Sequence, residues 1–480
     1  FQLLQPHAEI NLQNHVVQED NAKAISKLTA FLELSRTNNS AISITPEYSC
    51  PWSVIEEITN NKLYQPNIGS LLILGCESIE PADLQSLIEN TTNDIEWHHE
   101  PIIVNDQQKF LSCVVYILHL ETSTPEQHDL CGIVQFKTHD MGGTLFERDK
   151  LIKGSTIYEL ENLVTDESPI SIKLLTLICA DGFHFDPIIL QPLAPYLIIH
   201  IQLNTNPYDA TLMRYRTGIY SSPKKTEVEI LSLNWSADTK LYKDSVPTHN
   251  GSTYYIQGEK LDKEPCQTEE RIDANHALGV HLRYSKSLKF KTYTLSSEEG
   301  VFIFNTTKVN QQTFGPHENR SGIQNIERLS WNDETSHWER IDHIDDGIEE
   351  DFRKTSTNDC VGYLNREKLI TLSTGNIDET FCLRKIPKEL PEFVKNEYTS
   401  YIWHQPSCLS SMHLTSANKP RGTLALLDRD QEQFVEASIA SLSNIIEYVK
   451  QKDALPEILE DFGSGGFQLK LSENELASGC

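Results

Sequence analysis

The sequence contains no apolar run approaching the roughly 20 residues that a membrane-spanning helix needs. Its longest apolar runs, such as Leu71–Leu74 and Leu197–Ile199, have the length of a β-strand. The first residue is Phe1, and no signal-peptide pattern follows it. We therefore expect a cytoplasmic protein that does not contact membranes, either as a processed form or as part of a longer polypeptide.

Sequence patterns for metal or cofactor binding are also missing. The ten cysteines form no Cys-x-x-Cys pair, which is a weak signal for disulfides and for zinc, so we expect reduced thiols. The segment Glu96-Trp97-His98-His99-Glu100 gathers two histidines and two carboxylates. Neighbouring side chains in an extended segment point to opposite faces, so a shared metal ion is not expected there. With no glycine-rich phosphate loop either, the sequence predicts no cofactor.

Positive charge is scarce. The chain has 41 Lys and Arg against 69 Asp and Glu, a formal net charge of −28. Such a field repels phosphate backbones, which makes nucleic acid an unlikely partner for this segment.

Apolar spacing predicts strands interleaved with helices, and hence an α/β fold. Helices are predicted at 22–34 and 83–89, where apolar residues recur every three or four positions. Short apolar or alternating runs predict strands at 41–45, 71–74, 113–120, 132–136, 172–179, 196–201, 228–233, 279–283, 289–295 and 300–305.

The predicted elements and the composition divide the chain into three parts. Residues 1–305 are predicted to form the main domain, in which the polar stretch 239–266 is a long surface loop. Residues 306–350 are predicted to be an acidic connection, and 351–480 a C-terminal extension of unknown fold that does not complete the central sheets. Within that extension an amphipathic helix is expected from about 431 to 451.

Three predicted strands each stop at one titratable residue. The first strand is followed by Pro46-Glu47, the second by Lys137 and the third by Cys179. Parallel strands often present active-site groups at their carboxyl ends. Each residue also has an ordinary structural explanation, because a cysteine at a strand end is usually a small buried hydrophobe. The order and the shared position favour one common site.

These motifs resemble the nitrilase, or carbon–nitrogen hydrolase, superfamily. Its pattern is a strand followed by Pro-Glu, a strand ending in Lys and a strand ending in Cys-x-Asp, here Cys179-Ala180-Asp181. The stretches Glu147-Arg148 and 154–157, then 203–207 and 231–235, are similar to later parts of the pattern. The resemblance covers roughly residues 7–305 and implies a four-layer α-β-β-α sandwich.

The resemblance also implies roles. Cys179 would attack a small-molecule nitrile or amide, Glu47 would be the general base, and Lys137 would stabilise the developing anion. Glu147 would position the substrate or the lysine. Members of the superfamily commonly form homo-oligomers, so one is expected here.

A second hypothesis stays open at this point. The domain could be a regulatory or scaffold module of a larger protein, because nitrilase-like domains occur in multidomain proteins. These include fusions to reverse transcriptases in bacterial antiphage defence.

Overall fold

The computed structural model describes residues 1–341 except for 13–14, 92–94, 103–108, 121–129, 141–144, 162–171, 192–194, 205–214, 217, 220–227, 237–238, 242–251, 258–277, 279, 286–289, 297 and 307–322. The chain divides into two units, Phe1–Gln257 with Ser297–Asp342, and Gly258–Ser296 with His343–Cys480. The helix expected at 431–451 and the extension 351–480 lie outside the described residues.

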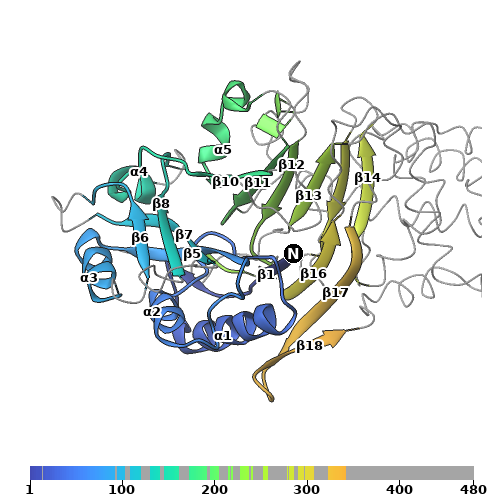
Figure 1. Cartoon of the computed structure of the whole chain (residues 1–480), viewed down its shortest axis with the longest axis horizontal. Helices are drawn as coiled ribbons and strands as arrows, with labels where there is room; N and C mark the ends of the chain where they lie inside the picture. Colours follow the sequence, from blue (N-terminus) through green and yellow to red (C-terminus); the bar gives the residue numbers. More distant parts are fainter. Residues whose placement is uncertain are drawn as a thin grey trace, which may run out of the picture. The chain divides into compact units, whose positions relative to one another are not determined.

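The first unit contains a nine-stranded mixed sheet with the order β18-β17-β16-β1-β4-β5-β7-β8-β6 (Figure 1). Its strands are β1 (Gln2–Gln5), β4 (Ile42–Ile44), β5 (Leu71–Ile79), β6 (Glu96–His99), β7 (Leu111–His119), β8 (Leu130–Phe136), β16 (Gly300–Thr306), β17 (Ile323–Asn332) and β18 (His337–Ile341). The pair β4 and β5 is parallel, whereas β7 runs antiparallel to both of its neighbours. A small separate ladder joins β2 (Ile10–Asn11) and β3 (Val17–Gln18).

A second sheet in the same unit has the order β13-β12-β11-β10-β9. Its strands are β9 (Glu159–Leu160), β10 (Lys173–Ile178), β11 (Tyr196–Ile201), β12 (Val228–Leu233) and β13 (Thr253–Gln257). The three central strands are parallel, so their carboxyl ends meet at one edge. In the second unit, β14 (His281–Ser285) and β15 (Phe290–Thr294) form an antiparallel hairpin.

Helices α1 (Asn21–Thr37), α2 (Trp52–Asn60) and α3 (Pro81–Thr91) pack on one face of the nine-stranded sheet. Leu28 and Phe31 of α1 share a core with Leu72 and Leu74 of β5. Asp20 caps α1 by accepting a hydrogen bond from the Lys23 amide. The apolar spacing that predicts this helix therefore also explains what it buries.

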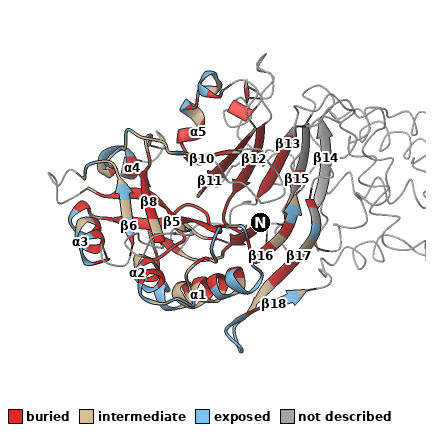
Figure 2. Ribbon diagram, in the orientation of Figure 1, coloured by how far each residue is buried: buried red, intermediate tan, exposed pale blue. Residues whose placement is uncertain are grey.

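The opposite face of this sheet meets the second sheet. The Gln135 amide of β8 donates a 2.9 Å hydrogen bond to the Thr176 carbonyl of β10. All residues of β5 are buried because helices cover one face and the second sheet covers the other (Figure 2). Small helices complete the unit: α4 (Leu145–Lys150), α5 (Asp181–His184), which packs on β10, and the 3-10 turn Pro187–Ile189.

The predicted α/β architecture with two large sheets is confirmed. Among the described helices, none combines the length and the apolar character needed to cross a membrane.

Two predictions about segments were wrong. The stretch 239–266 is not one surface loop, because it contains β13, whose Tyr254, Tyr255 and Ile256 are buried. The stretch 306–350 is not simply an acidic connection either, because β17 and β18 extend the nine-stranded sheet from within it. Trp338 of β18 is buried against α1 and donates a hydrogen bond to the Lys27 carbonyl. One apolar face thus suffices to dock an otherwise acidic hairpin.

Candidate active site

Glu47 is held by a tight turn after β4. The neighbouring strand β5 has Gly75 at the point of closest approach, where an added Cβ would lie 2.1 Å from the Pro46 carbonyl oxygen. The Ser49 amide donates to the Gly75 carbonyl at 2.8 Å and closes the turn. A glycine is therefore required for the turn to lie against the sheet, and Glu47 ends up 1% exposed.

Lys137 follows β8 directly and is completely buried. Its ammonium donates to Glu47 Oε1 at 2.8 Å and to Glu147 Oε1 at 2.7 Å. Glu147 comes from α4, and the Tyr48 hydroxyl donates to the same oxygen of Glu147 at 3.0 Å. One cation therefore joins two carboxylates, both of which are shielded from solvent.

The second sheet supplies further contacts to Glu47. The Leu203 amide, just beyond β11, donates to Glu47 Oε2 at 3.0 Å. The Trp235 indole, just beyond β12, donates to the Glu47 carbonyl at 2.7 Å. Glu47 is therefore fixed from both sheets.

Cys179 follows β10 and is 2% exposed. Its φ is 44°, in the left-handed region that residues with a Cβ rarely occupy. The Cys179 amide donates to the Ile201 carbonyl at 2.8 Å, which extends the β10–β11 pairing to the turn. Strained backbone of this kind is often found at functional sites and persists only where the surroundings enforce it.

The charge state of the site follows from burial and proximity. Burial raises the pKa of Glu47 to about 7, Lys137 opposes this rise, and Glu147 adds to it. Burial by itself would lower the pKa of the Lys137 ammonium, but Glu147 and Glu47 outweigh it and raise that pKa well above the ordinary value. Burial raises the pKa of the Cys179 thiol, and the Glu47 carboxylate raises it further, both through its charge and as a hydrogen-bond partner of the thiol.

Asp181, two residues after the cysteine, connects two strand ends. Its Oδ1 accepts hydrogen bonds from the Thr138 and His139 amides at 3.0 and 2.9 Å, and its Oδ2 accepts one from the Ile178 amide at 3.2 Å. The turn after Lys137 is therefore tied to the turn at Cys179.

The structure thus brings together all four residues singled out from the sequence: Glu47, Lys137, Glu147 and Cys179. Tyr48 and the contacts that Leu203 and Trp235 make with Glu47 could not be singled out from the sequence. Leu203 and Trp235 lie in the stretches 203–207 and 231–235 that resemble the superfamily pattern. Each comes just after a predicted strand, and this position was the sequence signal that could have marked it as a site residue.

No group of three or more His, Cys, Asp or Glu residues is placed to hold a metal ion in the described part of the chain. In β6, His98 lies 3.5 Å from Glu96, while the His99 ring contacts the Glu100 carbonyl at 2.8 Å.

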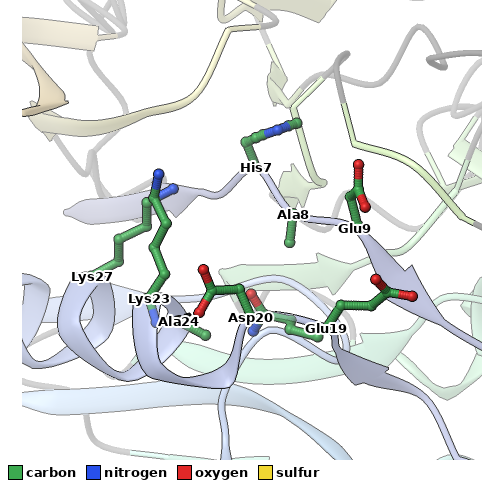
Figure 3. A pocket seen from close by; sticks show the side chains of 9 residues that line it. His7, Ala8, Glu9, Glu19, Asp20, Lys23, Ala24 and Lys27 are labelled. Carbon is green, nitrogen blue, oxygen red and sulfur yellow. Dashed lines mark hydrogen bonds between the residues drawn. The ribbon is translucent and has the colours of Figure 1, made fainter. Parts of the chain in front are cut away.

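A separate pocket of about 480 Å³ lies beside the first turns of α1 (Figure 3). Its lysines already have partners, since Lys27 contacts Glu299 at 2.5 Å and Lys23 contacts Asp333 at 2.6 Å. None of the four residues of the candidate site lines it; the lining residues are His7, Ala8, Glu9, Gln18, Glu19, Asp20, Lys23, Ala24 and Lys27.

Neither a family model nor a curated protein matches the chain. Among solved structures it is similar to an amidase from Nesterenkonia sp., with 10% identity over 53% of this chain and 80% of the amidase chain, at a TM-score of 0.28. It is also similar to a glutamine-dependent NAD(+) synthetase from Cytophaga hutchinsonii, with 11% identity over 53% of this chain and 38% of the synthetase chain, at a TM-score of 0.30.

Proposed function

We propose that this chain is a cysteine-dependent carbon–nitrogen hydrolase that acts on a small nitrile or amide through a covalent thioimidate or thioester. The observation that carries the proposal is the buried contact set at Cys179. The thiol lies on a strained turn and is close enough to Glu47 for that carboxylate to raise the pKa of the thiol, and Glu47 is itself paired with Lys137. Nucleophile, base and cation are the three parts that acyl transfer requires.

In the first step, Glu47 takes the thiol proton as the Cys179 sulfur bonds to the substrate carbon. A pKa of about 7 leaves a substantial fraction of Glu47 ionised at neutral pH, while it remains a useful acceptor. The raised pKa of the thiol means that the thiolate is not the resting form, so proton transfer accompanies attack. Negative charge develops on the carbonyl oxygen, or on the nitrogen of a nitrile.

That developing charge is stabilised by the Lys137 ammonium, aided by the backbone N–H of Ala180. With an amide, the protonated Glu47 returns its proton to the leaving nitrogen, the carbon–nitrogen bond breaks, and a thioester remains. With a nitrile, the proton goes to the substrate nitrogen and gives a thioimidate, which then takes up water and releases ammonia. Glu47 next deprotonates a water molecule, which attacks the thioester and frees Cys179 and a carboxylic acid.

Glu147 and Tyr48 act through Lys137 in this scheme. Glu147 accepts a hydrogen bond from the ammonium at 2.7 Å, and the Tyr48 hydroxyl fixes Glu147. Together they keep the cation in one position and protonated throughout the cycle.

The test uses the full chain in two stages. Limited iodoacetamide followed by intact-mass and peptide analysis should show one main adduct at Cys179. Cys179→Ala should lose that adduct, and Cys131→Ala, which removes a half-buried thiol, should keep it. A panel of small amides and nitriles is then screened for ammonia release that depends on Cys179.

Absence of preferential labelling, or activity that survives Cys179→Ala, would replace the proposal with the alternative of a regulatory or scaffold module, for instance in an antiphage defence protein. Light scattering of the same samples tests the proposed homo-oligomer.

A further inference from the structure

The peptide bond between Cys179 and Ala180 is held from one side. The Cys179 carbonyl accepts hydrogen bonds from the Gly182 amide at 3.1 Å and from His200 Nε2 at 2.8 Å. In a trans peptide the carbonyl and the following N–H point in opposite directions. The Ala180 N–H therefore points away from His200, and no acceptor for it is found among the described residues.

The hydrogen bonds fix the tautomer of His200. Its Nε2 must donate, because the partner is a carbonyl oxygen. Its Nδ1 then accepts, and the Gln202 amide lies 2.9 Å away as the donor. The same Gln202 nitrogen donates to Ser232 Oγ at 2.8 Å, which fixes the orientation of its amide.

His200 is fully buried and is not placed for proton transfer. Burial lowers its pKa to about 3, the hydrogen bond to the Cys179 carbonyl opposes this, and Arg216 adds to the lowering. Its Nε2 proton is committed to a backbone carbonyl. The ring packs closely under the turn, since a Cβ on Gly182 would lie 2.9 Å from His200 Cε1. The Tyr215 ring packs perpendicular to the His200 ring, with the ring centroids 5.4 Å apart.

We infer that His200 is a positioning residue, which holds the Cys179 carbonyl so that the Ala180 N–H is aimed at the oxyanion formed during acylation. This inference rests on the proposed function. Electrostatic stabilisation of this kind depends on donors that are oriented before the reaction begins. With a pKa of about 3, His200 stays neutral at neutral pH, and its single N–H remains bound to the Cys179 carbonyl.

Two chemical probes separate this role from simple support of the fold. Acylation by p-nitrophenyl acetate passes through a tetrahedral oxyanion before p-nitrophenolate leaves. Alkylation by iodoacetamide displaces iodide at a saturated carbon and forms no oxyanion. Both transfer the thiol proton to Glu47 and bond the Cys179 sulfur, so they share nucleophile and base. Loss of the oriented donor should therefore slow acylation alone.

The experiment measures both rates at Cys179 by mass spectrometry in the full chain. His200→Phe keeps a buried ring but lacks the donor, and acylation should fall roughly 10- to 100-fold, somewhat less than removal of an oxyanion donor. Alkylation should change less than about threefold. His200→Gln places a donor near the position of Nε2 and should recover most of the acylation rate. The matched control Tyr215→Phe removes a hydroxyl 3.4 Å from Nδ1 and should leave both rates unchanged.

If His200→Phe does not fold, Gln202→Met provides a weaker form of the test, because it removes the donor to Nδ1 that helps to hold the His200 ring against the Cys179 carbonyl. Selective loss of acylation supports the inference. Equal losses in both reactions, or no loss in either, would overturn it while the proposed function stands. Failure of the unmodified protein to react at Cys179 with either reagent would overturn both, and the unmodified protein alone reveals that outcome.

Discussion

Removal of the Lys137 ammonium should produce a loss of stability that depends on pH. Lys137→Met keeps the length and apolar stem of the side chain but leaves Glu47 and Glu147 without the cation that they share at 2.8 and 2.7 Å. Breaking a buried ion pair by removing one partner costs about 3–5 kcal/mol. The folded variant can reduce this cost only by holding a proton on the carboxylates.

The sign of the pH dependence follows from the carboxylates. Lys137 lowers the pKa of Glu47, so without it that pKa lies above its present value of about 7. A carboxyl group whose pKa is higher in the folded than in the unfolded protein stabilises the fold at low pH. This contribution is lost as the pH rises through the folded-state pKa. Above pH 7 the unmodified protein releases a proton that the variant retains. Each pH unit over which the variant retains it adds about 1.4 kcal/mol to the loss.

The assay is urea unfolding followed by tryptophan fluorescence at pH 6 and 8.5, with buried Trp235 as a reporter beside Glu47. The matched control is Lys173→Met, because Lys173 also contacts two carboxylates. Those carboxylates are 36% and 55% exposed and remain solvated, so the free energy of unfolding should fall by less than about 1 kcal/mol at either pH. Equal losses for the two variants, or a loss at Lys137 that does not change with pH, would refute the reasoning.

Three further outcomes are expected. Cys179→Ala should abolish turnover while unfolding at nearly the same urea concentration, since little packing is lost, and Cys179→Ser should be almost as inactive; retained turnover in either would contradict the mechanism. The rate of Cys179 alkylation should rise with pH, with an inflection near pH 7 where Glu47 ionises. Glu47→Gln should lose this inflection, and alkylation of Cys131 in the same samples serves as an internal reference. Gly75→Ala should displace the turn that carries Glu47, because its Cβ would collide with Pro46, and both labelling and thermal stability should drop; an unchanged melting temperature would argue against the described packing.

Much of the central architecture could be read from the sequence because its strands are buried on both faces. The runs in β5, β10 and β11 are mostly apolar, and such a pattern is visible in the sequence without knowing which strands pair. The amphipathic spacing of α1 is equally local. Strand ends with single titratable residues could be recognised for the same reason, which is how Glu47, Lys137 and Cys179 were found.

Other features depend on partners that are distant in the sequence. The hairpin of β17 and β18 lies in a polar stretch with few apolar residues, and only docking against α1 makes Trp338 part of the core. Strand β13 is a short apolar run in a polar stretch, and its pairing with β12 decides its conformation. The role inferred for His200 depends on the backbone geometry at Cys179, and no sequence pattern predicts that geometry.

The division of the candidate site between two sheets has a consequence for the newly made chain. Glu47 and Lys137 belong to one sheet and Cys179 to the other, and the Leu203 and Trp235 contacts to Glu47 form only when the sheets have docked. Until then Cys179 lies apart from Glu47 and Lys137. The hydrolysis proposed for this site therefore requires both sheets to be docked, so turnover of a substrate would report completed assembly of the domain.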